Sequence, residues 1–188
     1  MSKKLDHRKR YTRKVLKDSL ITLMAEKKIA AITVKEICAL AKVNRSTFYA
    51  HFKDPFDLLD HIEEEISEDM QRYLENIPLN SDEVAQEMTE QILHYLKEHR
   101  MIIETLLNHE GAPTFEKKLM TLTRQYMVKG ALRDAEVDDT ELRYLTTFVL
   151  SGAIHVIKDW IEQDMVQSPA EIARMINSFV TSGFSYLR

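Results

Sequence analysis

The sequence contains few of the residues that break helices or cross-link a chain. It has four glycines, four prolines and one cysteine among 188 residues. A lone cysteine, Cys38, excludes an intramolecular disulfide, and no run of about 20 apolar residues could span a bilayer. We also find no secretory leader after the charged start. These absences predict a cytoplasmic protein that does not enter a membrane.

Strand-forming patterns are also missing, because no segment of strand length alternates Val, Ile or Thr with polar residues. The scarcity of glycine and proline leaves few breaks between helices. An apolar content of 44% is ordinary for a globular chain. We therefore predict an all-α fold of about nine helices, arranged as one large domain or two small ones.

Motifs for catalysis or metal binding are absent from the sequence. It has no glycine-rich phosphate loop, no serine elbow, no paired cysteines and no HExxH. His94, His99 and His109 fall in one region, but their spacing does not place them on one helical face. Cys38 lies on the apolar stripe of a short helix, so we assign it to packing in preference to redox sensing. We predict a protein that is not an enzyme and needs no cofactor or metal.

Charge is distributed very unevenly along the chain. Residues 1–53 carry 14 Lys and Arg against 4 Asp and Glu, whereas residues 54–188 carry 12 and 26. A basic end attracts a phosphate backbone, and an acidic body keeps the rest of the molecule away from it. Ser2, Lys3 and Lys4 are expected to form a disordered tail. The cations that lead into an amphipathic helix, and are candidates for contacts in a minor groove, are Arg8, Lys9, Arg10, Arg13 and Lys14.

Residues 32–53 fit two short helices joined by a turn. Apolar residues recur at helical intervals on both sides of a break at residues 42–44. They are Val34, Ile37, Cys38 and Ala41 before the break, and Phe48 and Phe52 after it. Thr33 and Asn44 are placed to cap the two helices, because either side-chain oxygen can accept a hydrogen bond from an unpaired backbone N–H.

The second short helix exposes a polar face once its phenylalanines turn inward. Arg45 can bind guanine with two hydrogen bonds, and Ser46 and Thr47 can pair with base edges or phosphates. Tyr49 can donate to a phosphate or pack on a thymine methyl, and Lys53 neutralises backbone charge. A plain solvated face is the alternative, but the paired helices, the turn and the flanking charge favour a nucleic-acid surface.

The segment Thr33 to Lys53, followed by DPFDLLDHI, resembles the DNA-binding head of the TetR family of transcriptional regulators. The resemblance implies a three-helix, helix-turn-helix DNA-binding head over residues 1–54. It also implies a larger helical body over residues 55–188, which dimerises and binds an effector. A helix over about residues 55–75 would connect the two.

By the same resemblance, the second short helix enters the major groove of double-stranded DNA. The residues expected to face the groove are Arg45, Ser46, Thr47 and Tyr49, and those expected to approach phosphates are Thr33, Lys35, His51 and Lys53. Two positions depart from the family's pattern. Lys42 stands where a turn glycine is usual, so a positive φ there would be strained. Pro55 replaces a lysine that often opens the fourth helix, and it supplies no cation.

Helix signals divide the remaining sequence. We expect a first helix at about 9–26 and a fourth from Pro55, followed by helices at about 80–97, 101–107, 114–132, 138–163 and 168–186. Side chains expected to point inward are Tyr11, Val15, Ile21 and Met24 in the first helix, and Phe56, Leu58, Leu59, Ile62 and Ile66 in the fourth. Carboxylates expected to form a solvated face on the fourth are Glu63, Glu64, Glu65, Glu68 and Asp69. Capping boxes are expected at Asn80 with Glu83 and at Asp138 with Glu141, and Ser168, Pro169 and Glu171 signal the start of the last helix.

The last two long helices are expected to build a homodimer interface, as the resemblance implies. Ser151, Gly152 and Ala153 would let a partner helix approach closely, although packing within one chain is the alternative. A small-molecule effector site is a further expectation, with ordinary core packing as its alternative. The residues that could line such a site are His94, Tyr95, Met120, Tyr126, Phe148, His155 and Trp160.

The sequence therefore predicts a homodimeric DNA-binding regulator that recognises a palindromic operator. A repressor released from DNA by its effector is the first hypothesis. The alternatives are an activator, a regulator controlled by a protein partner, and a helical interaction module that has lost DNA binding.

Overall fold

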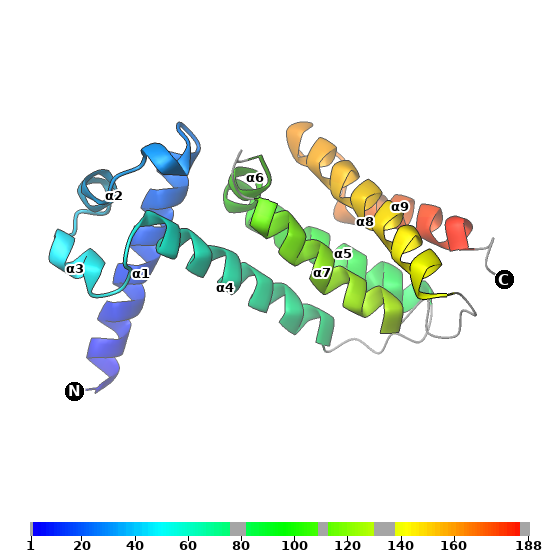
Figure 1. Ribbon diagram of the computed structural model, residues 1–188, viewed down its shortest axis with the longest axis horizontal. Helices are drawn as coiled ribbons and strands as arrows, with labels where there is room; N and C mark the ends of the chain where they lie inside the picture. Colours follow the sequence, from blue (N-terminus) through cyan, green and yellow to red (C-terminus); the bar gives the residue numbers. More distant parts are fainter. Residues whose placement is uncertain (1, 76–81, 109–112, 130–137, 185–188) are drawn as a thin grey trace. The chain divides into compact units, whose positions relative to one another are not determined.

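The computed structural model describes residues 2–75, 82–108, 113–129 and 138–184. These residues form α-helices and one short 3-10 helix, with no strand among them (Figure 1). This confirms the predicted all-α fold. The helices are α1 (Ser2–Met24), η1 (Ile29–Ala31), α2 (Val34–Ala41), α3 (Arg45–Tyr49), α4 (Pro55–Glu75), α5 (Asp82–Glu98), α6 (Arg100–Asn108), α7 (Pro113–Lys129), α8 (Asp139–Glu162) and α9 (Pro169–Phe184). None of them is long and apolar enough to cross a membrane.

The chain divides into two compact units, and α4 runs from one into the other. Unit 1 comprises Met1–Ile66 and Thr105–Pro113, and unit 2 comprises Ser67–Glu104 and Thr114–Arg188. Unit 1 therefore contains α1, α2, α3 and the first half of α4.

The core of unit 1 forms where α1 packs on α2 and where α3 closes against them (Figure 1). Side chains spaced three and four residues apart on each helix share a face, so each helix buries one apolar stripe. The fully buried side chains at the centre are Leu16, Leu20, Ile37, Phe48 and Leu58.

Four predictions about α1 and α4 are wrong. The first helix begins at Ser2, so Ser2, Lys3 and Lys4 are helical rather than a disordered tail. Tyr11 is 63% exposed, because the buried stripe of α1 runs through Thr12, one position further round the helix.

The other two corrections concern α4. Phe56 is 52% exposed, since it lies in the first turn, ahead of the buried stripe. Glu63 is only 1% exposed, although it was expected on the solvated face. It stands four residues after Leu59 and three before Ile66, and both of those side chains are buried, so helical geometry turns Glu63 to the same side.

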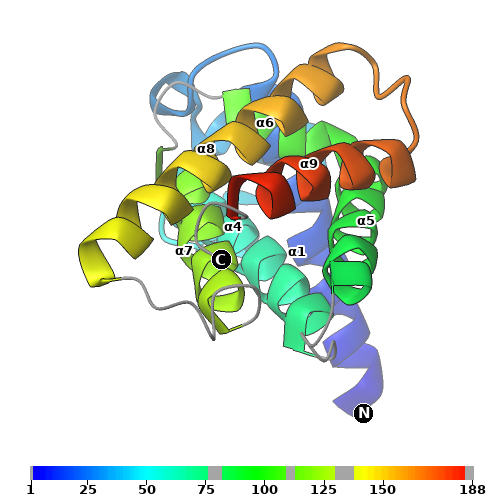
Figure 2. The ribbon, with the colours of Figure 1, turned by 90° about the vertical axis from the view of Figure 1, so that its right-hand side faces the viewer.

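In unit 2, α9 packs along α5 and also contacts α8 (Figure 2). Polar contacts fasten the other helices. The Tyr95 hydroxyl of α5 donates to the Asp69 carboxylate of α4 at 3.2 Å, and the Arg100 guanidinium of α6 lies 2.8 Å from the Asp164 carboxylate. Arg124 of α7 donates to the hydroxyl of Thr146, a fully buried residue of α8, at 3.1 Å.

The capping predictions have mixed outcomes. The Asp138 carboxylate accepts hydrogen bonds from the backbone N–H groups of Thr140 and Glu141, so it caps α8 as expected. α9 begins at Pro169, as its start signal predicts, and Ser168 and Glu171 form a reciprocal capping pair there. Asn80 lies outside the described residues, as do the side chain of Glu83 and the predicted end of the last helix at 185–186.

Candidate nucleic-acid interface

The first helix of the predicted helix-turn-helix, α2, begins with a complete capping box. The Glu36 backbone N–H donates to Thr33 Oγ1 at 3.3 Å, and the Thr33 backbone N–H donates to Glu36 Oε2 at 2.9 Å. Lys27 also donates to the Glu36 carboxylate. These contacts, led by the one from Lys27, lower the pKa of Glu36 to about 2. The cap predicted for Thr33 is confirmed, and its hydroxyl is held at the entrance to α2.

The turn between α2 and α3 is held by backbone hydrogen bonds that close the end of α2. Val43 N–H donates to the Cys38 carbonyl at 3.0 Å, and Lys42 N–H to the Ala39 carbonyl at 3.4 Å. This pair of bonds is the Schellman motif, in which the penultimate residue takes a left-handed conformation. Lys42 does so, with φ 55° and ψ 42°, in the place where glycine is the usual residue.

The second short helix, α3, is oriented by its aromatic residues. Phe48 is fully buried and Phe52 nearly so, with their ring centroids 5.9 Å apart. Tyr49 meets Phe48 edge-on at 5.6 Å and remains 59% exposed. Arg45 and Ser46 are exposed on the same short helix. The sequence reasoning placed this face outward, and the exposures agree with it.

Two local details of α3 differ from the expectations or refine them. Asn44 stands at the N-cap position, but its side chain makes no capping hydrogen bond, so that prediction is wrong. Thr47 is half-buried, unlike its exposed neighbours. Its contribution to a groove contact would therefore be smaller than that of Ser46.

The residues expected near phosphates lie at the start of α2 and just after α3. Thr33, Lys35 and Lys53 are exposed, whereas His51 is half-buried. Burial lowers the pKa of His51, and the positive charges of Arg13 and Lys9 on α1 lower it further. At neutral pH the imidazole is therefore uncharged, in a neighbourhood that is already cationic.

Pro55 and Cys38 lie near α3 in the sequence but have structural roles. α4 begins at Pro55, with the Asp57 N–H donating to the Asp54 carboxylate at 2.9 Å. The Asp57 carboxylate in turn accepts from the Lys53 N–H at 2.8 Å. Burial raises the pKa of the Cys38 thiol, which keeps it protonated and unreactive at neutral pH.

The residues proposed for an effector site do not converge. His94, His155 and Phe148 are exposed, and Met120 is half-buried. The side chain of Tyr126 lies outside the described part of the chain. Tyr95 and Trp160 are buried and engaged in structural contacts. The Tyr95 ring lies 4.4 Å from that of His99, and the Trp160 indole N–H donates to the Gln167 carbonyl at 3.0 Å.

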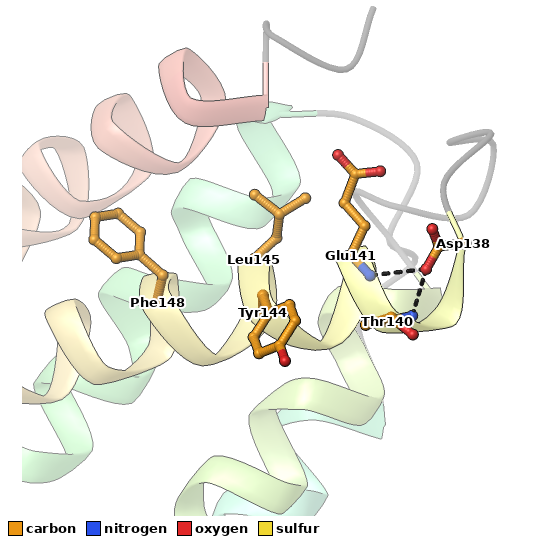
Figure 3. Close-up of a pocket in the computed structure, with 6 residues that line it drawn as sticks. All are labelled: Asp138, Thr140, Glu141, Tyr144, Leu145 and Phe148. Atoms are coloured by element: carbon orange, nitrogen blue, oxygen red, sulfur yellow. Dashed lines mark hydrogen bonds between the residues drawn. The ribbon is translucent and has the colours of Figure 1, made fainter.

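A hollow of about 540 Å³ lies along the first half of α8 (Figure 3). Of the effector-site candidates, Phe148 alone lines it, together with Tyr144 and Leu145, which the sequence reasoning missed. The spacing of four residues between Tyr144 and Phe148, which puts both on one helical face, was the available signal. Among the described residues, no three His, Cys, Asp or Glu side chains are grouped so that they could hold a metal ion.

A basic three-helix unit that presents a short polar helix, joined to a larger helical unit, defines the class of helix-turn-helix DNA-binding regulators. Comparison with known proteins agrees. The family model for "Bacterial regulatory proteins, tetR family" matches residues 18–62, and the model for "Transcriptional regulator C-terminal region" matches residues 83–182. The chain belongs to the TetR family of transcriptional regulators.

Individual relatives are distant. YxbF of Bacillus subtilis (strain 168), described as an HTH-type transcriptional regulator, is 23% identical over 88% of this chain, which spans only 44% of that relative. A TetR regulator from Streptococcus agalactiae 2603V has 21% identity and a TM-score of 0.71, covering 96% of this chain and 99% of its own. FadR from Bacillus subtilis in complex with stearoyl-CoA has 15% identity and a TM-score of 0.67, with coverages of 90% and 97%. These structures share the fold.

Proposed function

We propose that this regulator is a repressor that binds a palindromic operator as a homodimer and is released by an effector. The carrying observation is the outward face of α3, where Arg45, Ser46 and Tyr49 are exposed above the buried Phe48. Arginine bound to guanine through two hydrogen bonds is the commonest specific contact in a major groove. In this proposal residues 1–54 read DNA, and residues 55–188 dimerise and sense the effector.

The phosphate-contacting role extends to residues around α3. Lys35 in the first turn of α2 and Lys53 shortly after α3 are exposed cations, and Thr33 presents a hydroxyl at the start of α2. Phosphate contacts fix the register on which base contacts depend. The family and this charge distribution support action on double-stranded DNA, and in this proposal the protein works in the cytoplasm.

A homodimer is supported by the apolar surface that α8 and α9 leave exposed. Phe148 is 80% exposed and Phe179 68% exposed, on two helices that contact each other. A Cβ built on Gly152 would meet nothing within 4 Å, so α8 is open to a partner helix at that position. Two copies would present two α3 helices to successive half-sites about 34 Å apart or a multiple of that distance.

Effector control requires a ligand that binds one separation of the two heads better than another, typically by about 1–3 kcal/mol. The similar FadR structure is a complex with stearoyl-CoA, which makes a long-chain acyl-CoA the first class of effector to test. A protein partner docking on the body, or activation rather than repression, remains the second hypothesis.

The decisive experiment measures binding to DNA upstream of the protein's own gene and its neighbours, by mobility shift. Arg45→Ala is expected to weaken specific binding by about 1–3 kcal/mol, roughly 5- to 150-fold. Tyr49→Ala tests the second contact, and Tyr49→Phe keeps the ring against Phe48 while removing the hydroxyl. Lys117→Ala removes an exposed cation from α7 and should bind like the parent.

Equal binding by Arg45→Ala, Tyr49→Ala and the parent would overturn the role of α3. No binding by the parent to any duplex would favour the interaction module. A reporter gene driven by the bound promoter then separates repression from activation, since deletion of the regulator raises expression in the first case and lowers it in the second.

The dimer has its own test by light scattering at several protein concentrations. Phe148→Glu should shift the protein to monomer, because it places a charge in the proposed interface. Val166→Glu makes the same change at a residue 78% exposed in the turn after α8 and should leave the dimer intact. A parent protein that is strictly monomeric would refute the dimer.

A further inference from the structure

The N-terminal half of α1 is rich in positive charge. Residues 7–17 contain six Lys and Arg and no Asp or Glu. Among these, Arg8, Lys9, Arg13 and Lys14 are exposed. α1 is a continuous helix from Ser2, so these cations are displayed on a regular helical surface rather than on an arm.

Part of this charge lies beside the candidate DNA surface. Lys9 and Arg13 are four residues apart and therefore share one face of α1. Both lie close enough to His51, just after α3, for their charges to act on its imidazole. Further along α1 the situation changes, because Lys17 pairs with Glu65 of α4. The cationic surface of Lys9 and Arg13 therefore adjoins the residues just after α3. Further along α1, the positive charge of Lys17 is balanced by Glu65.

The helical form of α1 decides what these cations can contact. An α-helix with its side chains is about 10–12 Å across, whereas the minor groove of B-DNA is about 6 Å wide. An intact helix cannot enter that groove as an extended arm does. Side chains four residues apart on a helix are separated by about 5–6 Å, and phosphates of one strand advance about 3.4 Å along the duplex per nucleotide. Lys9 and Arg13 can therefore engage nearby phosphates of one strand.

We infer that Lys9 and Arg13 of α1, beside His51, form a second phosphate-binding site. This site contacts the DNA backbone that flanks the half-site read by α3. This inference rests on the proposed DNA-binding function and adds a partner surface to it. The occupant is the phosphodiester backbone of duplex DNA, chosen by charge complementarity and by continuity with the α3 surface. This second phosphate-binding site contributes affinity without sequence preference, because phosphates carry no base information.

The test uses the full-length chain and the operator identified by mobility shift, prepared at full length and trimmed to the bases that α3 requires. Lys9→Gln/Arg13→Gln should make the log–log salt slope on the long duplex less negative by about 1.8 per head, from about 0.9 for each lost phosphate contact. On the trimmed duplex the double variant and the parent should have the same slope. Lys97→Gln/Lys117→Gln removes the same charge from exposed positions on α5 and α7 and should match the parent on both duplexes.

Ethylation interference identifies the phosphates directly. Ethylation of phosphates outside the half-site should inhibit DNA binding by the parent. The same modification should not affect binding by Lys9→Gln/Arg13→Gln. A double variant with the parent's slope on the long duplex would overturn the inference, as would interference at adenine N3, which reports insertion into the minor groove. If the parent binds the operator but ethylation of the flanking phosphates has no effect, the second phosphate-binding site alone is refuted. If the parent binds no duplex, the proposed function is refuted as well.

Discussion

Lys42 offers a direct way to measure the strain in the turn between α2 and α3. Its φ of 55° and ψ of 42° place it in the left-handed region, and the Val43 N–H bond to the Cys38 carbonyl requires that conformation. A side chain at such a position costs about 1–2 kcal/mol, because Cβ approaches the following carbonyl. Glycine avoids that cost.

Lys42→Gly should therefore stabilise the folded head. Glycine loses more chain entropy on folding than lysine does, and this cost offsets about 0.5–1 kcal/mol of the strain that is relieved. The net expected stabilisation is about 0.5–1 kcal/mol. Lys42 is exposed, so its removal leaves no hole in the core.

The assay must report on the head, because the single tryptophan, Trp160, lies in unit 2. Hydrogen exchange of peptides covering α2 and α3 meets this need, under conditions where exchange follows opening of the head. Lys42→Gly should slow exchange roughly two- to fivefold, the factor that corresponds to about 0.5–1 kcal/mol. Trp160 fluorescence during urea unfolding should stay unchanged and serves as the internal control.

Lys42→Ala separates strain from charge. Alanine also removes the ammonium group but keeps a Cβ in the left-handed region, so it should give no protection. Equal slowing by Lys42→Ala and Lys42→Gly would show that the charge, not the backbone, was unfavourable. Faster exchange in Lys42→Gly would refute the reasoning altogether.

Three further predictions follow from individual contacts. The pKa of Glu36 is lowered to about 2, so its contribution to stability is present above about pH 4.5 and lost as pH falls toward 2; Glu36→Gln should flatten that part of the acid-unfolding curve. Phe48→Ala should cost about 3–5 kcal/mol in urea unfolding, because Phe48 is fully buried, whereas Phe56→Ala at a half-exposed ring should cost far less. Thr146→Val should destabilise unit 2 by about 1–3 kcal/mol, since the Nε–H of Arg124 loses its buried acceptor while the guanidinium keeps its bonds to the Arg143 carbonyl and the Thr147 hydroxyl; an unchanged urea midpoint would contradict this prediction.

The head could be predicted from sequence because its signals are local. Thr33 and Glu36 stand at the spacing of a capping box, and the stripe of α2 ends where Lys42 turns the chain. Such contacts join residues within one or two turns, so the sequence contains both partners side by side. The same reasoning assigned a cap to Asn44, where the residue type is right but the side chain makes no such bond.

Contacts between distant segments could not be predicted in this way. The residues expected to line an effector site fail to converge for this reason. Tyr95 pairs with Asp69, 26 residues away, and sequence spacing says nothing about which aromatic side chain meets which helix. Periodicity gives the face of a helix, but it does not give the partner of that face.

The distribution of ion pairs in the head explains how one helix can serve both packing and DNA binding. α1 buries Leu16 and Leu20, so it must stay attached to the core along its second half. There its lysine, Lys17, is matched by Glu65 of α4. Toward the N-terminus, residues 7–14 include five cationic and no acidic side chains, and the charges of Lys9 and Arg13 act on His51, just after α3. The Lys17–Glu65 pair therefore leaves the positive charge of α1 concentrated toward its N-terminal half, where it favours a polyanion near α3.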